Sequence, residues 1–338
     1  MNNGQSLKII NITILILIIC VVAYFIGMRD LSIGTDTPMY VRLYNAVLSG
    51  ADTRINEFFF LFLVKVSSAL GVGPSGFLYV ISFLSILGLL YFYHKSTDLF
   101  PEKTTVSTKV FFIVTAFAIT MISPFFWNAE LNVIRAGLSI PLFLTGALFL
   151  YQKKYFASLV FVLFAVLTHY SSLLFVPLLY LLRVKEKTLL IVYILLSLLY
   201  VTGISQKIFM IVSQKLYTID YLTYYLKNAL DERGYRAGVR YDFWLFTTFF
   251  FYMIYRIRNT SALSDFLFRI YMLLTVPFLF LGYINFSDRL LLAAWNVIPL
   301  LGALYMTKYV QTNMYSYAMS ILLLLVFSVS SLVFFRLV

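Results

Sequence analysis

Two histidines occur in this chain of 338 residues, and one of them, His169, interrupts a long apolar run. Residues 155–182 around it contain no charged side chain. An imidazole ionises near neutral pH, so a position in or beside hydrocarbon is unfavourable unless the ring faces a partner or a water-filled cavity. His169 is therefore the first candidate for a general base. The alternative is a structural histidine at a helix end, hydrogen-bonded to Ser171 or Ser172.

Two carboxylates precede apolar helical patterns near the N-terminus. Asp36 lies in the turn at residues 34–38, where Thr37 is the expected N-cap and Pro38 the expected first helical residue. Asp36 is then either a capping residue or a catalytic carboxylate that accepts a substrate hydroxyl. Glu57 opens the next apolar segment, where it either stabilises a helix N-terminus or takes part in the chemistry.

Two arginines each begin an apolar helix later in the chain. Arg135 follows the turn at residues 128–132, and Arg289 follows Asp288. A guanidinium keeps its charge, and near a helix N-terminus it opposes the helix dipole. The alternatives that need no ligand are an Arg135 side chain that snorkels to the membrane interface and a local ion pair between Asp288 and Arg289. Because planar guanidinium donors match phosphate oxygens, the two arginines together favour a phosphate or diphosphate site.

A loop at residues 205–241 is rich in tyrosine and arginine, and it includes Tyr235, Arg236 and Arg240. Aromatic faces stack on sugar rings, and the polar tips of these side chains can bind hydroxyls. A belt of tyrosines at the membrane interface explains part of this composition without a ligand. The arginines beside the tyrosines favour substrate contact.

The composition indicates the fold class. Hydrophobic residues form 62% of the chain and charged residues only 12%, whereas soluble domains carry about 25% charged residues. We therefore expect an all-α, polytopic integral membrane protein, with about 10–11 transmembrane or half-spanning helices in a single domain over residues 1–338. The net charge of +12 does not indicate nucleic acid, because no soluble basic domain is present. The single Cys20 excludes a disulfide framework, and no Cys/His metal cluster occurs.

Apolar runs place the expected membrane segments. The candidates lie at about residues 8–27, 75–94, 110–127, 131–151, 155–169, 171–183, 188–204, 242–257, 265–284, 290–307 and 314–335.

Charge orients these segments. The short connections at residues 152–154, 183–187 and 256–258 hold seven basic residues and one acid, so the positive-inside rule places all three in the cytoplasm. Residues 155–183 must then enter the membrane and return, with His169 at the turn near the outer face, rather than form one long tilted helix. Residues 28–74 and 205–241 become outer loops. Within the first of them, residues 57–71 are expected to form an interfacial or re-entrant helix.

Four fragments carry a resemblance to a known family. They are GTDTPMYVRLYN with the following Glu57, LNVIRAGLSIPLFLTGALFLYQKKYF, LTHYSSLLFVPL and FSDRLLLAAWNVIP, in this order over residues 34–299. The set resembles the EpsG/Wzy group of bacterial polysaccharide polymerases. That group often has glutamine after the arginine matching Arg135, where this chain has Ala136.

The resemblance implies a GT-C-like glycosyltransferase in the bacterial inner (cytoplasmic) membrane. Such enzymes polymerise oligosaccharide repeat units carried on undecaprenyl diphosphate, at the periplasmic face, into O-antigen, capsule or exopolysaccharide. They are expected to need no metal and no cofactor. The implied partners are the lipid-linked oligosaccharide and membrane lipid, and the resemblance admits a separate chain-length regulator protein.

The resemblance also suggests roles for the residues. Fixed cations would stabilise the leaving diphosphate, and a base would take the proton of the attacking hydroxyl. His169 is the first choice for the base, with Asp36 or Glu57 orienting the acceptor or competing for that role. The remaining candidates are the diphosphate ligands Arg135, Arg289, Arg236 and Arg240, and the substrate contacts Tyr40, Tyr170, Tyr235 and Asp288.

Three other functions remain open from the sequence. One is another GT-C transferase, either an O-antigen ligase or an enzyme that uses a polyprenyl-monophosphate sugar. The second is a lipid-linked oligosaccharide flippase or polysaccharide exporter, although the chain has no internal repeat of the kind transporters use. The third is a membrane acyltransferase with His169 as its base.

Overall fold

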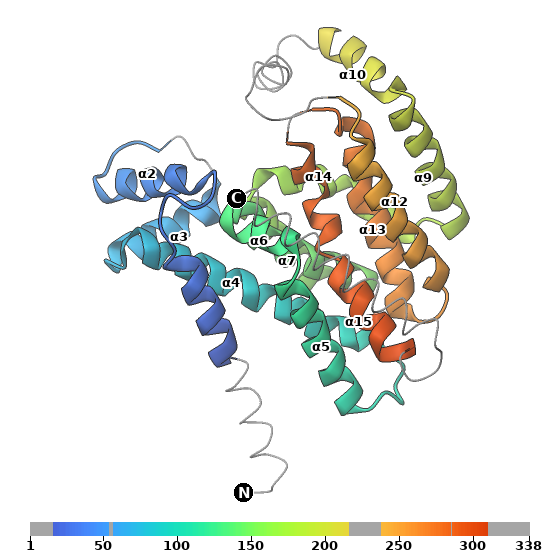
Figure 1. The fold of residues 1–338 in the computed structure, drawn as a ribbon, viewed down its shortest axis with the longest axis horizontal. Helices are drawn as coiled ribbons and strands as arrows, with labels where there is room; N and C mark the ends of the chain where they lie inside the picture. Colours follow the sequence, from blue (N-terminus) through green and yellow to red (C-terminus); the bar gives the residue numbers. More distant parts are fainter. Residues whose placement is uncertain (1–15, 54–56, 216–237, 285, 310–338) are drawn as a thin grey trace, which may run out of the picture.

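The computed structural model of the chain describes residues 16–53, 57–215, 238–284 and 286–309 (Figure 1). Within these ranges the ordered elements are helices, and no strand occurs. The prediction of an all-α, polytopic membrane protein is confirmed. Four described helical segments are long and apolar enough to cross a membrane. They are α4 (Gly73–Ser96), α7 (Ile134–Tyr151), α13 (Ala262–Leu281) and the pair α14 (Ser287–Trp295) and α15 (Ile298–Tyr309).

Two of the predicted spans are divided into shorter helices. The span expected at residues 110–127 is divided into α5 (Val106–Met121) and α6 (Pro124–Leu131), which meet at a bend of 68°. Pro124 starts α6, because a proline has no N–H to continue the preceding helix. The bent pair counts as a fifth candidate span. The span expected at residues 290–307 has a short break at residues 296–297 between α14 and α15, but the two helices together count as one candidate span. The span expected at residues 314–335 and the first part of the span expected at 8–27 lie outside the described residues.

The centre of the bundle is α13, which is buried on every side. It packs against α9 (Glu186–Val201), α12 (Tyr241–Ile257) and α14, and it also contacts α10 (Ile204–Lys215). A helix that is apolar all round belongs inside a bundle or membrane domain, and the sequence of α13 has this character. In Figure 1, α9, α10, α12 and α13 form one side of the molecule.

The other side of the molecule is formed by α2 (Thr37–Leu48) and α3 (Phe58–Ala69) (Figure 1). These two helices pack on α4 and share a separate apolar cluster that includes Tyr40, Phe60 and Phe77. With 12 residues, α3 is about 18 Å long, whereas a bilayer core is about 30 Å thick. It is therefore too short to cross the membrane alone, in agreement with the expected interfacial or re-entrant helix.

A hairpin follows α7. It consists of α8 (Tyr155–Thr168) and two 3₁₀ segments, η2 (Tyr170–Phe175) and η3 (Pro177–Arg183). The guanidinium of Arg183 lies 5.3 Å from the centre of the Tyr155 ring, so the two ends of the segment meet. The predicted reversal of residues 155–183 at His169 is confirmed, and a single long helix is excluded. Gly146 on α7 permits close packing of α8, since an added Cβ would lie 2.7 Å from a methyl group of Val162.

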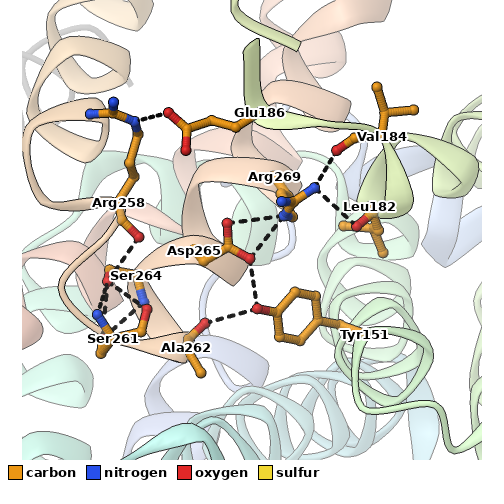
Figure 2. Close-up of polar contacts among 10 residues, drawn as sticks. All are labelled: Tyr151, Leu182, Val184, Glu186, Arg258, Ser261, Ala262, Ser264, Asp265 and Arg269. Atoms are coloured by element: carbon orange, nitrogen blue, oxygen red, sulfur yellow. Dashed lines mark hydrogen bonds and ion pairs between the residues drawn. The ribbon is translucent and has the colours of Figure 1, made fainter. Parts of the chain in front are cut away.

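The three basic connections meet at one end of the bundle, and Figure 2 shows the contact between two of them. Arg258 forms an ion pair with Glu186, and Arg269 donates to the carbonyl oxygen of Leu182 at 3.3 Å. Lys153 and Arg183 line one cavity at the same end. Arg135, at the start of α7, lies 16 residues and about 24 Å of helix away from this end. The predicted functional arginine and the basic connections are therefore at opposite ends.

Candidate active site

The first loop is fixed on the turn between α6 and α7. The backbone N–H of Thr35 donates to the side-chain oxygen of Asn132 at 2.9 Å, and the hydroxyl of Thr37 donates to the carbonyl of Leu131 at 3.3 Å. Gly34 has φ of +97°, and a Cβ there would lie 2.2 Å from the carbonyl oxygen of Leu131. Only glycine fits this left-handed close approach. These contacts set the start of α2 beside the start of α7.

The predicted cap of α2 needs a correction. Asp36, rather than Thr37, is the N-cap residue, and its side chain makes no capping hydrogen bond. Thr37 is instead the first helical residue, and its hydroxyl also accepts from Arg29 at 2.9 Å. The Asp36 carboxylate is therefore free to turn toward a distant partner, Arg289.

Glu57 is the centre of a three-residue cluster. It precedes α3, and its side chain is only 9% exposed. Arg135 donates through Nη1 to both Glu57 carboxylate oxygens at 2.8 Å, and His169 Nδ1 lies 3.2 Å from Oε1. Burial alone would raise the pKa of the Glu57 carboxyl, but the hydrogen bond from His169 and the charge of Arg135 lower it below its ordinary value. The carboxylate is thus held ionised between a cation and an imidazole.

His169 owes its position to a break in the backbone. It has an extended conformation, with φ of −153° and ψ of 111°, between the end of α8 and the start of η2. The Ser172 N–H donates to the His169 carbonyl at 3.0 Å, while the Ser172 hydroxyl pairs with the Ser139 hydroxyl. The imidazole pairs with Glu57 rather than with a neighbouring serine. A carboxylate that accepts from Nδ1 selects the neutral tautomer in which Nε2 is a hydrogen-bond acceptor, as a base requires.

A second ion pair lies beside this cluster. Arg289 Nη2 is 3.3 and 3.5 Å from the two Asp36 oxygens, and its guanidinium stacks 4.5 Å from the Phe286 ring centre. Tyr40 on α2 is buried, and the Arg135 guanidinium lies 5.8 Å from its ring centre. Burial raises the pKa of Tyr40, and the charges of Arg135, Asp36 and Arg289 all act on it. Tyr40 therefore lies within electrostatic range of both ion pairs.

Comparison with protein-family models matches residues 12–337 to the EpsG family. The chain belongs to the EpsG family. Membership implies a polysaccharide polymerase of the glycosyltransferase type. Comparisons with curated proteins and with solved structures gave no match.

The other predicted residues of this EpsG-family chain are more dispersed. Arg240 donates to Asp242 at 2.6 and 3.0 Å and stacks on Phe243, which makes it a locally paired cation. The charge of Asp288 also acts on Arg240, so these two residues are near each other. Tyr170 follows His169 and is exposed. Tyr235 and Arg236 lie outside the described residues.

Several polar residues near the site were not predicted. Asn128 accepts from the Asn132 amide at 2.9 Å, and Asn132 in turn accepts from Thr35, so these two amides connect the α6–α7 turn to the first loop. Glu130 is buried and accepts a hydrogen bond from Ser85. The sequence does contain a signal for these residues. They are polar side chains in a turn between two apolar helices, where each polar group needs a hydrogen-bond partner. These residues support the α6–α7 turn that presents Arg135.

Proposed function

We propose that this EpsG-family protein polymerises oligosaccharide repeat units carried on undecaprenyl diphosphate, at the periplasmic face of the bacterial inner membrane. The observation that carries the proposal is the Glu57 cluster with its neighbouring ion pair. Residues separated by 78, 112 and 253 positions in the sequence converge there, and they supply a paired imidazole and two guanidinium groups. Acceptor activation and stabilisation of a leaving diphosphate require these two kinds of group.

In the proposed reaction, a sugar hydroxyl at the non-reducing end of a new lipid-linked unit attacks the anomeric carbon of the growing chain. The new bond joins that carbon to the acceptor oxygen, and the bond to the diphosphate oxygen breaks. His169 Nε2 takes the hydroxyl proton, while Glu57 holds the ring through Nδ1. The diphosphate leaves with its negative charge, which Arg289 and Arg135 stabilise.

Arg135 has a donor left for this task. Its Nη1 is engaged by Glu57, whereas its Nε is buried and has no hydrogen-bond partner within the described residues. A buried donor without an acceptor is unfavourable, so a substrate oxygen at this point would satisfy it. Asp36 is assigned to acceptor orientation, and Tyr40, Tyr170, Tyr235 and Asp288 to substrate contact. Arg236 and Arg240 are assigned to assist with the diphosphate.

The test uses the purified protein in liposomes with the lipid-diphosphate-linked repeat unit of the source strain. Chelator is added, nucleotide is omitted, and the products are separated on a gel. The proposal expects a ladder at repeat-unit spacing, and its persistence in chelator supports metal independence. A single transfer to a different acceptor would favour the ligase alternative. Transbilayer movement of the oligosaccharide without chain growth would favour a flippase.

Arg289→Ala tests the diphosphate assignment, with Arg256→Ala as the matched control. Arg256 is exposed on α12, at the end of the bundle with the basic connections. The loss of one fixed cation at a developing charge lowers the rate by about 10²–10³-fold. Normal polymerisation by Arg289→Ala would refute the assignment, and an equal loss in Arg256→Ala would reduce it to a general charge effect.

A further inference from the structure

A cavity of about 430 Å³ opens at the end of α7 opposite the Glu57 cluster. Its charged lining consists of three cations, Lys153, Arg183 and Arg269, and one carboxylate, Asp265. The turn after α7, the end of η3 and the first turns of α13 each contribute to it. The cavity therefore joins three segments that are distant in sequence.

One cation and the carboxylate are already satisfied (Figure 2). Arg269 Nε donates to the two Asp265 oxygens at 2.8 and 3.0 Å, and the Tyr151 hydroxyl donates to Asp265 at 2.7 Å. Within the described part of the chain, Lys153 and Arg183 have no carboxylate partner. The three cations and one carboxylate of the lining thus give it a formal net charge of +2.

Lys153 occupies a position that favours glycine. Its N–H donates to the Leu150 carbonyl, and the next N–H, of Lys154, donates to the Phe149 carbonyl. These two bonds end α7 in a Schellman motif, whose left-handed residue is here Lys153, with φ of +62°. A lysine is strained in this conformation, whereas glycine is not. The sequence therefore accepts strain and places an ammonium group at the cavity.

An apolar surface leads away from the cavity. The Arg183 guanidinium covers one side of the Tyr155 ring, which is 56% exposed. Phe156, Leu159 and Leu163 continue along α8 and are also exposed. Residues at this spacing share a helix face. A cationic cavity that adjoins an exposed apolar helix face matches the two parts of a phospholipid, the phosphate and the acyl chains.

We propose that this cavity binds the phosphate group of an anionic phospholipid. Lys153 and Arg183 donate to the phosphate, and the exposed face of α8 lies along the acyl chains. Free phosphate shares the headgroup chemistry, but it would leave the adjoining apolar face without a role. The bound headgroup ties the base of the α8–η3 hairpin to the end of α7, and this site does not depend on the proposed polymerase activity.

The experiment is native mass spectrometry of the full chain in detergent. Phosphatidylglycerol is titrated against phosphatidylcholine, and inorganic phosphate is titrated in a parallel series. The variants are Lys153→Gly and Arg183→Gln, with Lys187→Gln as the control, because Lys187 is exposed at the same end but does not line the cavity. Each cavity variant is expected to bind phosphatidylglycerol about fivefold more weakly than the wild type, while the control is unchanged.

Lys153→Gly separates binding from folding. Its thermal unfolding midpoint in neutral detergent is expected to equal or exceed that of the wild type, because the backbone strain is removed. Wild-type affinity in both cavity variants, or equal losses in Lys187→Gln, would overturn the proposal. Inorganic phosphate that binds with the same dependence on Lys153 and Arg183, with no preference for phosphatidylglycerol, would keep a phosphate site and overturn the lipid source.

Discussion

Substitution of Glu57 tests whether the candidate site is one coupled unit. The Glu57 and Arg135 side chains are only 9% and 21% exposed, and Arg135 Nη1 lies 2.8 Å from Glu57 Oε1. For two groups in such contact the centres of charge are roughly 4 Å apart. At an effective dielectric constant of about 20, that separation corresponds to about 4 kcal/mol of attraction. Removal of one partner from a buried pair costs about 3–5 kcal/mol. Because Arg135 retains some access to solvent, we expect Glu57→Gln to destabilise the protein by about 3 kcal/mol, at the low end of this range.

A double-mutant cycle isolates the coupling. Glu57→Gln, Arg135→Met and the double variant are unfolded by sodium dodecyl sulfate in mixed micelles, and the free energies of unfolding are compared. We expect a coupling energy of about 2–3 kcal/mol, because the double variant has no buried charge left without its partner. Arg240 and Asp242 form the control pair, since Asp242 is 60% exposed and its coupling should stay below about 1 kcal/mol. A Glu57–Arg135 coupling no larger than this control would refute the reasoning.

Four further outcomes are expected. His169→Gln should lower the polymerisation rate by about 10²–10⁴-fold, as expected for loss of a general base, while the same change at the exposed His94 leaves the ladder intact. Folding lowers the pKa of Glu57, so the stability that this carboxylate contributes is complete above its ordinary pKa of 4.5 and is lost as the pH falls through the lower folded pKa. The midpoint of detergent unfolding should decline over that pH range in the wild type, and it should decline less in Glu57→Gln. Gly34→Ala should destabilise the protein by about 2 kcal/mol or more in the same unfolding assay, because its backbone is left-handed and a Cβ would meet a carbonyl oxygen. Asp36→Asn should strengthen the inhibition of polymerisation by inorganic diphosphate severalfold, because it frees the Arg289 guanidinium. Unchanged inhibition would show that the Asp36–Arg289 pair does not compete with the anion.

The sequence predicted the architecture where local patterns determine it. Apolar runs and the positive-inside rule gave the helical membrane fold and the reversal at His169, and the contact between Arg183 and Tyr155 agrees with that reversal. The break between α5 and α6 was missed, although Pro124 signals it, because the hydropathy of the run continues through the bend. Hydropathy averages over a window, whereas a proline acts at one residue.

The candidate residues were easier to predict than their partners. Charged or titratable side chains in apolar surroundings identified His169, Glu57 and Arg135. Their pairing could not be read from the sequence, because it depends on how the first loop packs on the α6–α7 turn. A local Asp288–Arg289 pair was one of two alternatives from the sequence, and the structure pairs the Arg289 guanidinium with Asp36. Contacts between segments more than 70 residues apart depend on tertiary packing, which local patterns do not specify.

The two ion pairs of the candidate site differ in a way that bears on the order of events during binding. With neutral His169, the formal charges of the two ion pairs sum to zero. An incoming diphosphate must therefore displace a carboxylate from one of the guanidinium groups to pair with its full positive charge. Glu57 contacts Arg135 at 2.8 Å through both oxygens and is also held by His169, whereas Asp36 and Arg289 are 3.3–3.5 Å apart. The Arg289 side chain is also 36% exposed, so solvent already weakens its pair. We therefore expect the Asp36–Arg289 pair to open for the anion, while Glu57 continues to hold the imidazole in the tautomer that a base requires.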